Sequence, residues 1–457
     1  MERSRRGLSI TVRLAALALA AFTLTLGTDR VVPRRAVAAE DQPAAVVVRA
    51  RRADDLNRVA AYARSIGYAV TSQMDALPAL RVVPPAGVTT ADALTAFRAR
   101  PGVEYAEPVY HMFRTADVPA DPLYGQEAPY LSVEHAPEAW DIEKGKSGVI
   151  VAVLDTGIDL SHPDLQGRIW ISTKETANNG VDDDHNGCID DVNGCAFLND
   201  VSPGCARSAN GNVRDDLGHG TFVAGVIAAA GNGQGMVGVA RGVTVLPVKV
   251  LDCQGDGDSL GLAEGIIYAA QAGAKIMNVS LGGPVDSAVV REAVRIAHDT
   301  YGALIVAAAG NGGTNGVAYP ARYPHVLAVG AVSAADPAKR APFSSYGPEI
   351  AVVAIGEGII GTVPKPSCAA FLPCINGDPY AKGSGTSFSA PQVAGLAALM
   401  LSHRPALKPD SIIAAIEATA DPLPDGGTPG WAGAGRINMA QALKPAFRLG
   451  APGVTKN

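Results

Sequence analysis

The chain is poor in aromatic side chains, in cysteine and in long apolar runs. Aromatic residues make up 5% of its 457 residues, and it contains six cysteines. The absence of any Cys-x-x-Cys pair or Cys/His cluster argues against a zinc site and against a thiol catalyst. After residue 39 no segment is apolar and long enough to span a bilayer, and no internal repeat occurs. The chain is instead rich in glycine, with 51 residues, which is typical of a tightly turned α/β fold with more than one domain.

Charge is divided unevenly along the chain. Residues 1–39 carry seven basic and two acidic side chains, and residues 40–115 carry nine and eight. Because the whole chain has a net charge of −6, residues 116–457 together carry −12. An acidic body of this size argues against nucleic acid as a partner.

The first 39 residues have the layout of an export signal. A basic start (1–6) precedes a short apolar run (14–24), and the alanines of 36–39 offer a small-residue cleavage site. We therefore predict a signal peptide over 1–39, a secreted protein, and no membrane association after cleavage. An uncleaved anchor is the alternative, because the stretch before the cut is long and charged.

Residues 40–115 are predicted to form a separate small unit. Apolar residues recur at helical spacing from Leu56 to Ala63, and Thr90 precedes Asp92 as a helix cap. A β-α-β-β-α-β order suits a ferredoxin-like α+β module. The elements expected are strands over 44–50, 79–83 and 103–108 and helices over 54–67 and 90–100.

Ser387 lies in a segment that favours nucleophilic chemistry. Residues 385–391 read GTSFSAP, so that a glycine turn leads into an apolar helix directly at the serine. The first turn of a helix presents unpaired N–H groups and a positive dipole end to the space before it. A free serine is a poor nucleophile, so this interpretation requires a base and an orienting acid elsewhere in the chain.

Two further segments supply those groups. His219 stands in 218–221 (GHGT), where a glycine-flanked turn enters a small-residue helix. Asp155 ends the apolar run 149–154, which predicts a buried parallel strand with the carboxylate at its carboxyl end. That end is where open α/β sheets place their sites. The alternatives are a core or surface histidine and a loop or capping aspartate.

The three motifs, in the order Asp155, His219, Ser387, resemble those of the subtilases, the subtilisin-like serine proteases. This order separates them from the α/β-hydrolases and the chymotrypsin type. The resemblance covers about residues 118–443. It implies a three-layer α/β fold with a mostly parallel central sheet over 116–457, with a short tail at 445–457. It also implies a secreted endopeptidase that cleaves protein or peptide substrates through an acyl-enzyme, with no cofactor for catalysis.

The resemblance assigns further site residues. Asn311 would donate its side-chain amide to the oxyanion, together with the Ser387 N–H. An extended substrate would add as a strand between two backbone segments, and Ala318 would lie at the base of the specificity pocket, favouring an apolar or medium-sized side chain. The two segments comprise Ser280, Leu281 and Gly282 on one side and Ala308, Ala309 and Gly310 on the other.

Residues 40–115 resemble the prodomain of these enzymes. Such a prodomain assists folding and inhibits the enzyme by leaving its C-terminal strand in the cleft. The resemblance implies a zymogen that processes itself near 113–116. An accessory domain without this role is the alternative.

Two calcium sites are expected, both structural. The spacing of Asp182, Asp184 and Asn186 before Gly187 matches the first half of a calcium loop, although the usual terminal glutamate is missing. Asp190 or Asp191 would have to replace it, and a solvated acidic loop is the alternative. The resemblance implies a second site whose side-chain ligands are Asp121, Asp164 and Asn232.

The six cysteines predict three disulfides in a secreted chain, with fifteen connectivities open in principle. Cys368 and Cys374 are close in one loop and are expected to pair. The resemblance favours Cys205–Cys253, which leaves Cys188–Cys195.

Three residues depart from the usual subtilase pattern: Phe222 and Gln392 where histidines are commoner, and Ile355 where proline is expected. None belongs to the proposed triad. The competing functions are an inactive subtilase fold used for binding and a peptide ligase or cyclase with the same acyl chemistry.

Overall fold

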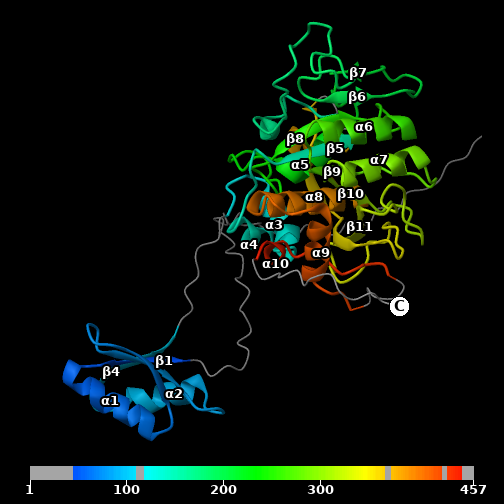
Figure 1. Ribbon diagram of the computed structural model, residues 1–457. Helices are drawn as coiled ribbons and strands as arrows, with labels where there is room; N and C mark the ends of the chain where they lie inside the picture. The colour runs from blue at the N-terminus through cyan, green and yellow to red at the C-terminus, as the bar shows by residue number, and fades with distance from the viewer. Residues whose placement is uncertain (1–44, 110–117, 366–371, 425–429, 445–457) are drawn as a thin grey trace, which may run out of the picture. The chain divides into compact units, whose positions relative to one another are not determined.

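The structure, a computed structural model, describes residues 45–109, 118–365, 372–424 and 430–444 (Figure 1). It divides into two compact units, Met1–Arg114 and Thr115–Asn457. The predicted signal peptide, the 113–116 junction and the 445–457 tail lie outside the described residues. Among the residues described, no helix combines the length and the apolar character needed to cross a membrane.

The smaller unit is a four-stranded antiparallel sheet with two helices. Strand order is β2-β3-β1-β4, and the elements follow one another as βαββαβ. Its core includes Val46, Leu56, Leu80 and Phe97, all fully or almost fully buried. Thr89, rather than Thr90, caps the second helix, since its hydroxyl accepts from the Asp92 N–H at 3.2 Å. The elements are β1 Val46–Ala50, α1 Ala53–Ser65, β2 Ala69–Met74, β3 Ala79–Val83, α2 Thr90–Arg98 and β4 Val103–Pro108.

One strand of this unit has no clear sequence pattern. Five of the six side chains of β2 are exposed, and apolar residues do not alternate with polar ones along the strand. The strand forms because it pairs with β3 along most of its length. Its residues could therefore not be identified from periodicity, which reports burial on one face.

The larger unit is built on an eight-stranded sheet of order β12-β11-β10-β9-β5-β8-β6-β7. The first seven strands are parallel, and β7 pairs antiparallel with β6. This is the α/β fold with a mostly parallel sheet that the sequence predicted. The strands are β5 Ile150–Asp155, β6 Cys195–Phe197, β7 Ala209–Asn210, β8 Thr244–Lys249, β9 Ile276–Val279, β10 Leu304–Ala308, β11 Val326–Val332 and β12 Val352–Ile355, with a separate hairpin of β13 Ile359–Thr362 and β14 Tyr380–Gly383.

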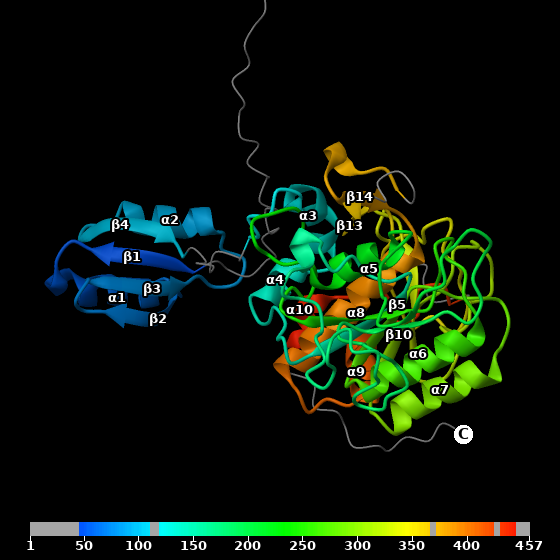
Figure 2. The same ribbon diagram turned by 90° about the horizontal axis from the view of Figure 1, so that it is seen from above.

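Helices cover both faces of this sheet. Figure 2 shows α5 and α8 on one side of β5 and β10, and α6 and α7 on the other. The core strands are buried on both faces because of these layers, which explains their continuous apolar sequences. The helices are α3 Tyr124–Val133, α4 Ala136–Trp140, α5 His219–Ala228, α6 Ser259–Gln271, α7 Ala288–Asp299, α8 Thr386–His403, α9 Pro409–Thr419 and α10 Met439–Leu443, with 3-10 turns at Pro163–Leu165 and Ile375–Gly377.

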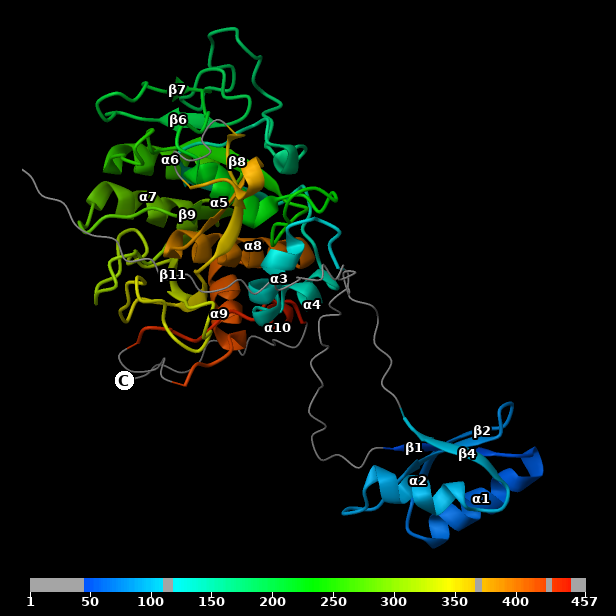
Figure 3. The ribbon, with the colours of Figure 1, turned by 180° about the vertical axis from the view of Figure 1, so that it is seen from behind.

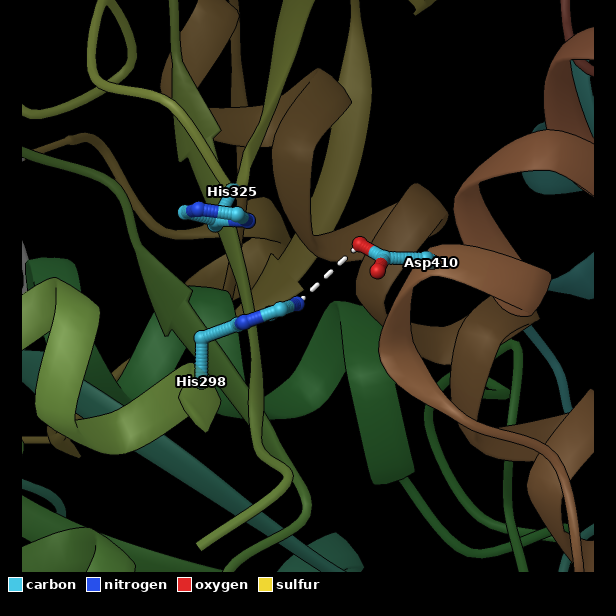
Figure 4. Close-up of side chains that lie close together, drawn as sticks. All are labelled: His298, His325 and Asp410. Carbon is cyan, nitrogen blue, oxygen red and sulfur yellow. Dashed lines mark hydrogen bonds and ion pairs between the residues drawn. The ribbon is translucent and has the colours of Figure 1, made fainter. Parts of the chain in front are cut away.

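The C-terminal helices close the unit beside α8. α9 and α10 contact α8 and each other (Figure 3). α7 and α9 are joined by His298, whose two ring nitrogens lie 2.9 Å from Asp299 Oδ1 and 3.0 Å from Asp410 Oδ1, while its ring stacks on that of His325 (Figure 4). Burial lowers the pKa of His298, but these two carboxylates raise it more, and the net shift is upward. Both ring nitrogens of His298 thus face a carboxylate oxygen.

Two departures from the subtilase pattern contact each other in the core. Gln392 donates from Nε2 to the Ile355 carbonyl at 2.6 Å and to the Phe388 carbonyl at 2.8 Å. The Ile355 N–H, which a proline would lack, donates to Oε1 of the fully buried Glu134 at 2.6 Å. Burial raises the pKa of Glu134 to about 8. The isoleucine thus provides a donor that a buried carboxyl group needs.

Candidate active site

The predicted site residues lie where elements of the larger unit begin or end. Asp155 is the last residue of β5, and His219 is the first residue of α5. Ser387 is in the first turn of α8, and Asn311 follows β10. Because β10, β9 and β5 are adjacent and parallel, their carboxyl ends meet at one edge of the sheet.

Asp155 and His219 form a short hydrogen bond inside this edge. His219 Nδ1 lies 2.7 Å from Oδ1 of Asp155, which is fully buried and also accepts from the Thr156 N–H at 2.8 Å. A carboxylate can only accept, so Nδ1 carries the proton and Nε2 of the neutral ring keeps its lone pair. In this tautomer Nε2 of His219 can accept a proton.

The charge balance around His219 favours its protonated form. Burial lowers the pKa of His219, but the charge of Asp155, its hydrogen bond and the charge of Asp215 raise it further, and the net shift is upward. The pair therefore stabilises the imidazolium that forms when the ring takes up a proton.

Sequence reasoning missed the group that holds His219 in place. The buried Asp215 carboxylate accepts from the Gly218 N–H at 2.7 Å, from the Thr221 N–H at 2.9 Å and from the Thr156 hydroxyl at 2.8 Å. These bonds cap the start of α5 and attach it to the end of β5. Asp215 precedes His219 by four residues. An aspartate just before a predicted helix start is the pattern from which a capping role could have been predicted.

Ser387 is held from the neighbouring strand end. Its hydroxyl donates to the Ser280 carbonyl at 3.1 Å, and the Ser280 hydroxyl donates to the Ser387 carbonyl at 2.8 Å. Asn278 on β9 donates to the Ser280 hydroxyl, also at 2.8 Å. Transfer of the Ser387 proton to another base requires the hydroxyl to leave the Ser280 carbonyl.

Asn311 is oriented by Thr386. The Thr386 N–H donates to Asn311 Oδ1 at 2.8 Å, and its hydroxyl lies 2.9 Å from the same oxygen. An N–H can only donate, so the oxygen of the amide must face Thr386. The Nδ2 group of Asn311 is then the end that can donate to another molecule. Thr386 was not identified from the sequence.

Three of the four predicted catalytic side chains border one cavity of about 510 Å³. His219, Asn311 and Ser387 line it, as do six of the seven residues predicted to contact substrate. Ala309 does not line the cavity, because it is fully buried. Its backbone forms hydrogen bonds with the backbone of Val329 and of Ala318. The six predicted residues that line the cavity are Ser280, Leu281, Gly282, Ala308, Gly310 and Ala318.

The expected calcium ligands near the start of the unit lie together. Asp121 Oδ1 accepts from the Asn232 N–H at 3.1 Å, and Asp164 Oδ2 accepts from the Met236 N–H at 3.0 Å. Asp121 Oδ2 and Asp164 Oδ1 are buried without a hydrogen-bond partner, and burial raises the pKa of Asp164 to about 6. Unpaired carboxylate oxygens in an all-oxygen set fit a calcium ion.

In the second expected set, Asp182, Asp184 and Asn186, two of the three side chains accept hydrogen bonds from backbone amides of their own turn. Asp182 accepts from the Asn186 N–H at 3.1 Å and from the Gly187 N–H at 2.9 Å. Asn186 Oδ1 accepts from the Cys188 N–H at 2.8 Å. Asp184 instead lies close to the carboxylates of Glu175, which is outside the predicted set, and of Asp191, one of the two residues expected to replace the missing glutamate.

Two of the expected disulfides are present, Cys188–Cys195 and Cys205–Cys253. Cys374 is also disulfide-bonded, but its expected partner Cys368 lies outside the described residues.

Comparison with known proteins agrees with this fold. The sequence profile of the subtilase family matches residues 146–435. A thermophilic serine proteinase of Bacillus sp. (strain AK1) is 38% identical over 345 residues, covering 75% of this chain and 73% of that protein. Thermitase of Thermoactinomyces vulgaris is 37% identical over 330 residues, covering 71% of this chain and 99% of thermitase.

A solved protease structure from Pseudoalteromonas arctica has a TM-score of 0.59 and 30% identity, covering 72% of this chain and 99% of that chain. The chain therefore belongs to the subtilase family and is a subtilisin-like serine peptidase, a hydrolase of peptide bonds.

Proposed function

We propose that this protein is a secreted serine endopeptidase made as a self-processing zymogen, with Asp155, His219 and Ser387 as its triad. The observation that carries the proposal is the 2.7 Å bond between Asp155 and His219 beside the cavity that Ser387 and Asn311 also line.

In this mechanism Ser387 attacks the carbonyl carbon of the scissile peptide while His219 Nε2 takes its proton. Asp155 keeps the ring in the required tautomer and stabilises the imidazolium. His219 then gives the proton to the leaving amine, and an acyl-enzyme remains. Water, deprotonated by the same nitrogen, attacks the ester and frees Ser387.

The developing oxyanion is stabilised by two donors, the Asn311 Nδ2 group and the Ser387 N–H. The latter belongs to the first turn of α8, whose N–H groups have no partners within the helix. Their positions are set before substrate arrives, since Thr386 holds Asn311 by its oxygen.

The cavity favours a small or medium apolar side chain before the scissile bond. A Cβ added to Gly282 would meet the Ala318 Cβ at 3.0 Å, and one added to Gly310 would meet it at 3.4 Å. Ala318 thus packs directly between the two substrate-binding segments and offers no charge to a basic side chain.

Residues 40–115 act in this proposal as the inhibitory and folding-assisting prodomain. Support comes from their separation as a compact unit with its own core and from the resemblance of its element order to such prodomains. Calcium, held by Asp121, Asp164 and Asn232, would be structural, stabilising the folded state by binding to it preferentially.

A fluorophosphonate tests the nucleophile directly. We expect the mature protein to gain one adduct by intact mass, located on Ser387 by peptide mapping, because only an activated serine reacts at a useful rate. Ser384→Ala is the matched control and should label fully. An unlabelled mature protein, or an adduct on another serine, would refute the proposal and favour an inactive fold used for binding.

Asn311→Leu should lower kcat by about 10²–10³-fold with little change in KM, since the lost donor acts on the transition state. Steady-state hydrolysis of a chromogenic peptide measures both constants. Asn315→Leu changes an exposed asparagine in the same loop that does not line the cavity, and it should behave as the parent does. Equal losses in both variants would point to general damage to the loop.

A further inference from the structure

Two histidines and one aspartate converge on the larger unit, away from the candidate active site. One nitrogen or carboxylate oxygen from each of His298, His325 and Asp410 lies within 4.8 Å of the others. His298 is in the last turn of α7, His325 directly precedes β11, and Asp410 is in the first turn of α9. Figure 4 shows the three side chains together. Three separate elements thus contribute to one cluster.

One ring nitrogen of His298 is fixed as a donor. Nδ1 lies 2.9 Å from Oδ1 of Asp299. Oδ2 of the same carboxylate accepts from Arg295 Nη1 at 3.2 Å, so Arg295 orients Asp299. A carboxylate can only accept, so Nδ1 of His298 carries a proton. Histidines that bind a metal through one nitrogen typically donate the other ring N–H to a carboxylate in this way.

The other ring nitrogen of His298 faces a second carboxylate. Nε2 lies 3.0 Å from Oδ1 of Asp410. When the ring is neutral, Nε2 carries a lone pair, so two acceptors would face each other unless a cation lies between them. Burial lowers the pKa of His298, but the hydrogen bonds and charges of Asp299 and Asp410 raise it further. The same negative charges attract a metal ion to this nitrogen.

His325 favours a metal ion over a proton at this position. A proton between Nε2 of His298 and Asp410 would satisfy that pair alone. The ring of His325 stacks on that of His298, with 4.0 Å between the centroids and 28° between the planes. Within the described part of the chain, no hydrogen bond or ion pair engages the nitrogens of His325. A second imidazole is therefore available as a ligand.

We propose that His298, His325 and Asp410 bind one zinc ion. Two imidazole nitrogens and one carboxylate oxygen, with water in the fourth position, form a typical zinc set, whereas calcium and magnesium prefer oxygen ligands. Zinc ligands at about 2.0–2.2 Å in a tetrahedron lie about 3.3 Å from one another, close to the 3.0 Å between His298 Nε2 and Asp410 Oδ1. His325 and Asp410 are exposed, so both side chains can turn toward an ion that arrives from solvent.

The ion would act on stability and not on peptide hydrolysis. His325 lies at the amino end of β11, whereas Asp155 and Asn311 lie at the carboxyl ends of β5 and β10. Zinc would therefore brace α7, β11 and α9 against one another, and would stabilise the folded state because it binds that state preferentially.

The absence of a Cys/His cluster in the sequence argued against zinc, and the fold explains the difference. Structural zinc motifs are recognised by ligands a few residues apart. His298 and Asp410 are 112 residues apart in the chain. Only the packing of α7 and α9 beside the start of β11 brings these ligands together.

Calorimetric titration with Zn²⁺ tests the site on the full chain. The protein carries Ser387→Ala to avoid autolysis, has no histidine tag, and is saturated with calcium to occupy oxygen-ligand sites. The parent should bind one zinc ion that His325→Asn does not bind, or binds at least about 10-fold more weakly. Asparagine suits this position because residue 325 has a left-handed backbone with φ 68°. His403→Asn, which changes an exposed histidine at the end of α8, should bind zinc as the parent does.

Asp299→Asn tests the orientation of His298. It removes no ligand, so one zinc ion should still bind, but with an affinity about 10–100-fold lower than in the parent. Zn²⁺ should also raise the Tm of the parent and of His403→Asn but not that of His325→Asn. The Tm values without zinc show whether each variant is folded.

A parent that binds no zinc saturably would overturn the proposal, as would a folded His325→Asn protein with the parent's zinc stoichiometry and affinity. Equal losses in His325→Asn and His403→Asn would also overturn it, because they would indicate binding to scattered surface histidines. None of these measurements depends on peptidase activity, so their outcome is independent of the function proposed above.

Discussion

Ser387→Ala should lower kcat by about 10⁶-fold, to the residual rate that substrate binding and the oxyanion donors support without a nucleophile. The fold should be kept, because the hydroxyl makes only one described hydrogen bond, to the Ser280 carbonyl, and such a bond is worth about 1 kcal/mol. Hydrolysis of a peptide library by the purified variant measures the loss, and the Tm measures the fold.

The same variant tests self-processing. Ser387→Ala should accumulate with residues 40–115 still attached, whereas Ser384→Ala should mature as the parent does. Mass spectrometry of the N-terminus distinguishes the two. If Ser387→Ala still lost this segment when produced alone, self-cleavage would be excluded while the peptidase assignment could stand. Product masses on a defined peptide also reveal any ligated or cyclised species, the outcome expected of a ligase.

Much of the site could be predicted because each proposed triad residue sits beside a strong local pattern. An unbroken apolar run marks β5 and so the position of Asp155, and glycine-flanked helix starts mark His219 and Ser387. These patterns are short-range, since they depend on burial of one strand or on the first turn of one helix.

The supporting groups could not be predicted in the same way, because their roles depend on contacts between distant segments. Asp215 caps α5 but also binds Thr156, 59 residues earlier. Thr386 orients Asn311 across 75 residues. Neither contact leaves a periodic trace in the sequence, and each becomes visible only when the sheet brings the segments together.

The calcium loop shows the limit of motif reading. The spacing of Asp182, Asp184 and Asn186 predicted three ligands, yet turn residues with short polar side chains satisfy nearby amides equally well. Asp182 does so here. Glu175 lies outside the motif, so only the folded loop indicates that its carboxylate reaches Asp184 and Asp191.

Asp155→Asn should lower kcat by about 10⁴-fold. The side chain keeps its size and an oxygen that can accept from the Thr156 N–H, so the fold should survive. The negative charge that stabilises the imidazolium of His219 is lost, however, and this charge acts in the transition state rather than in substrate binding. KM should therefore change far less than kcat.

The pH profile of this variant separates an electrostatic role from a structural one. His219 must be neutral to act as a base, so kcat/KM of the parent should rise as pH increases through the raised pKa of His219. In Asp155→Asn the largest causes of that rise disappear while burial, which lowers the pKa, remains. The acidic limb should then move to lower pH. Asp159→Asn, four residues away, should shift neither kcat nor the limb, and an acidic limb unmoved in Asp155→Asn would contradict the assigned pairing of Asp155 with His219.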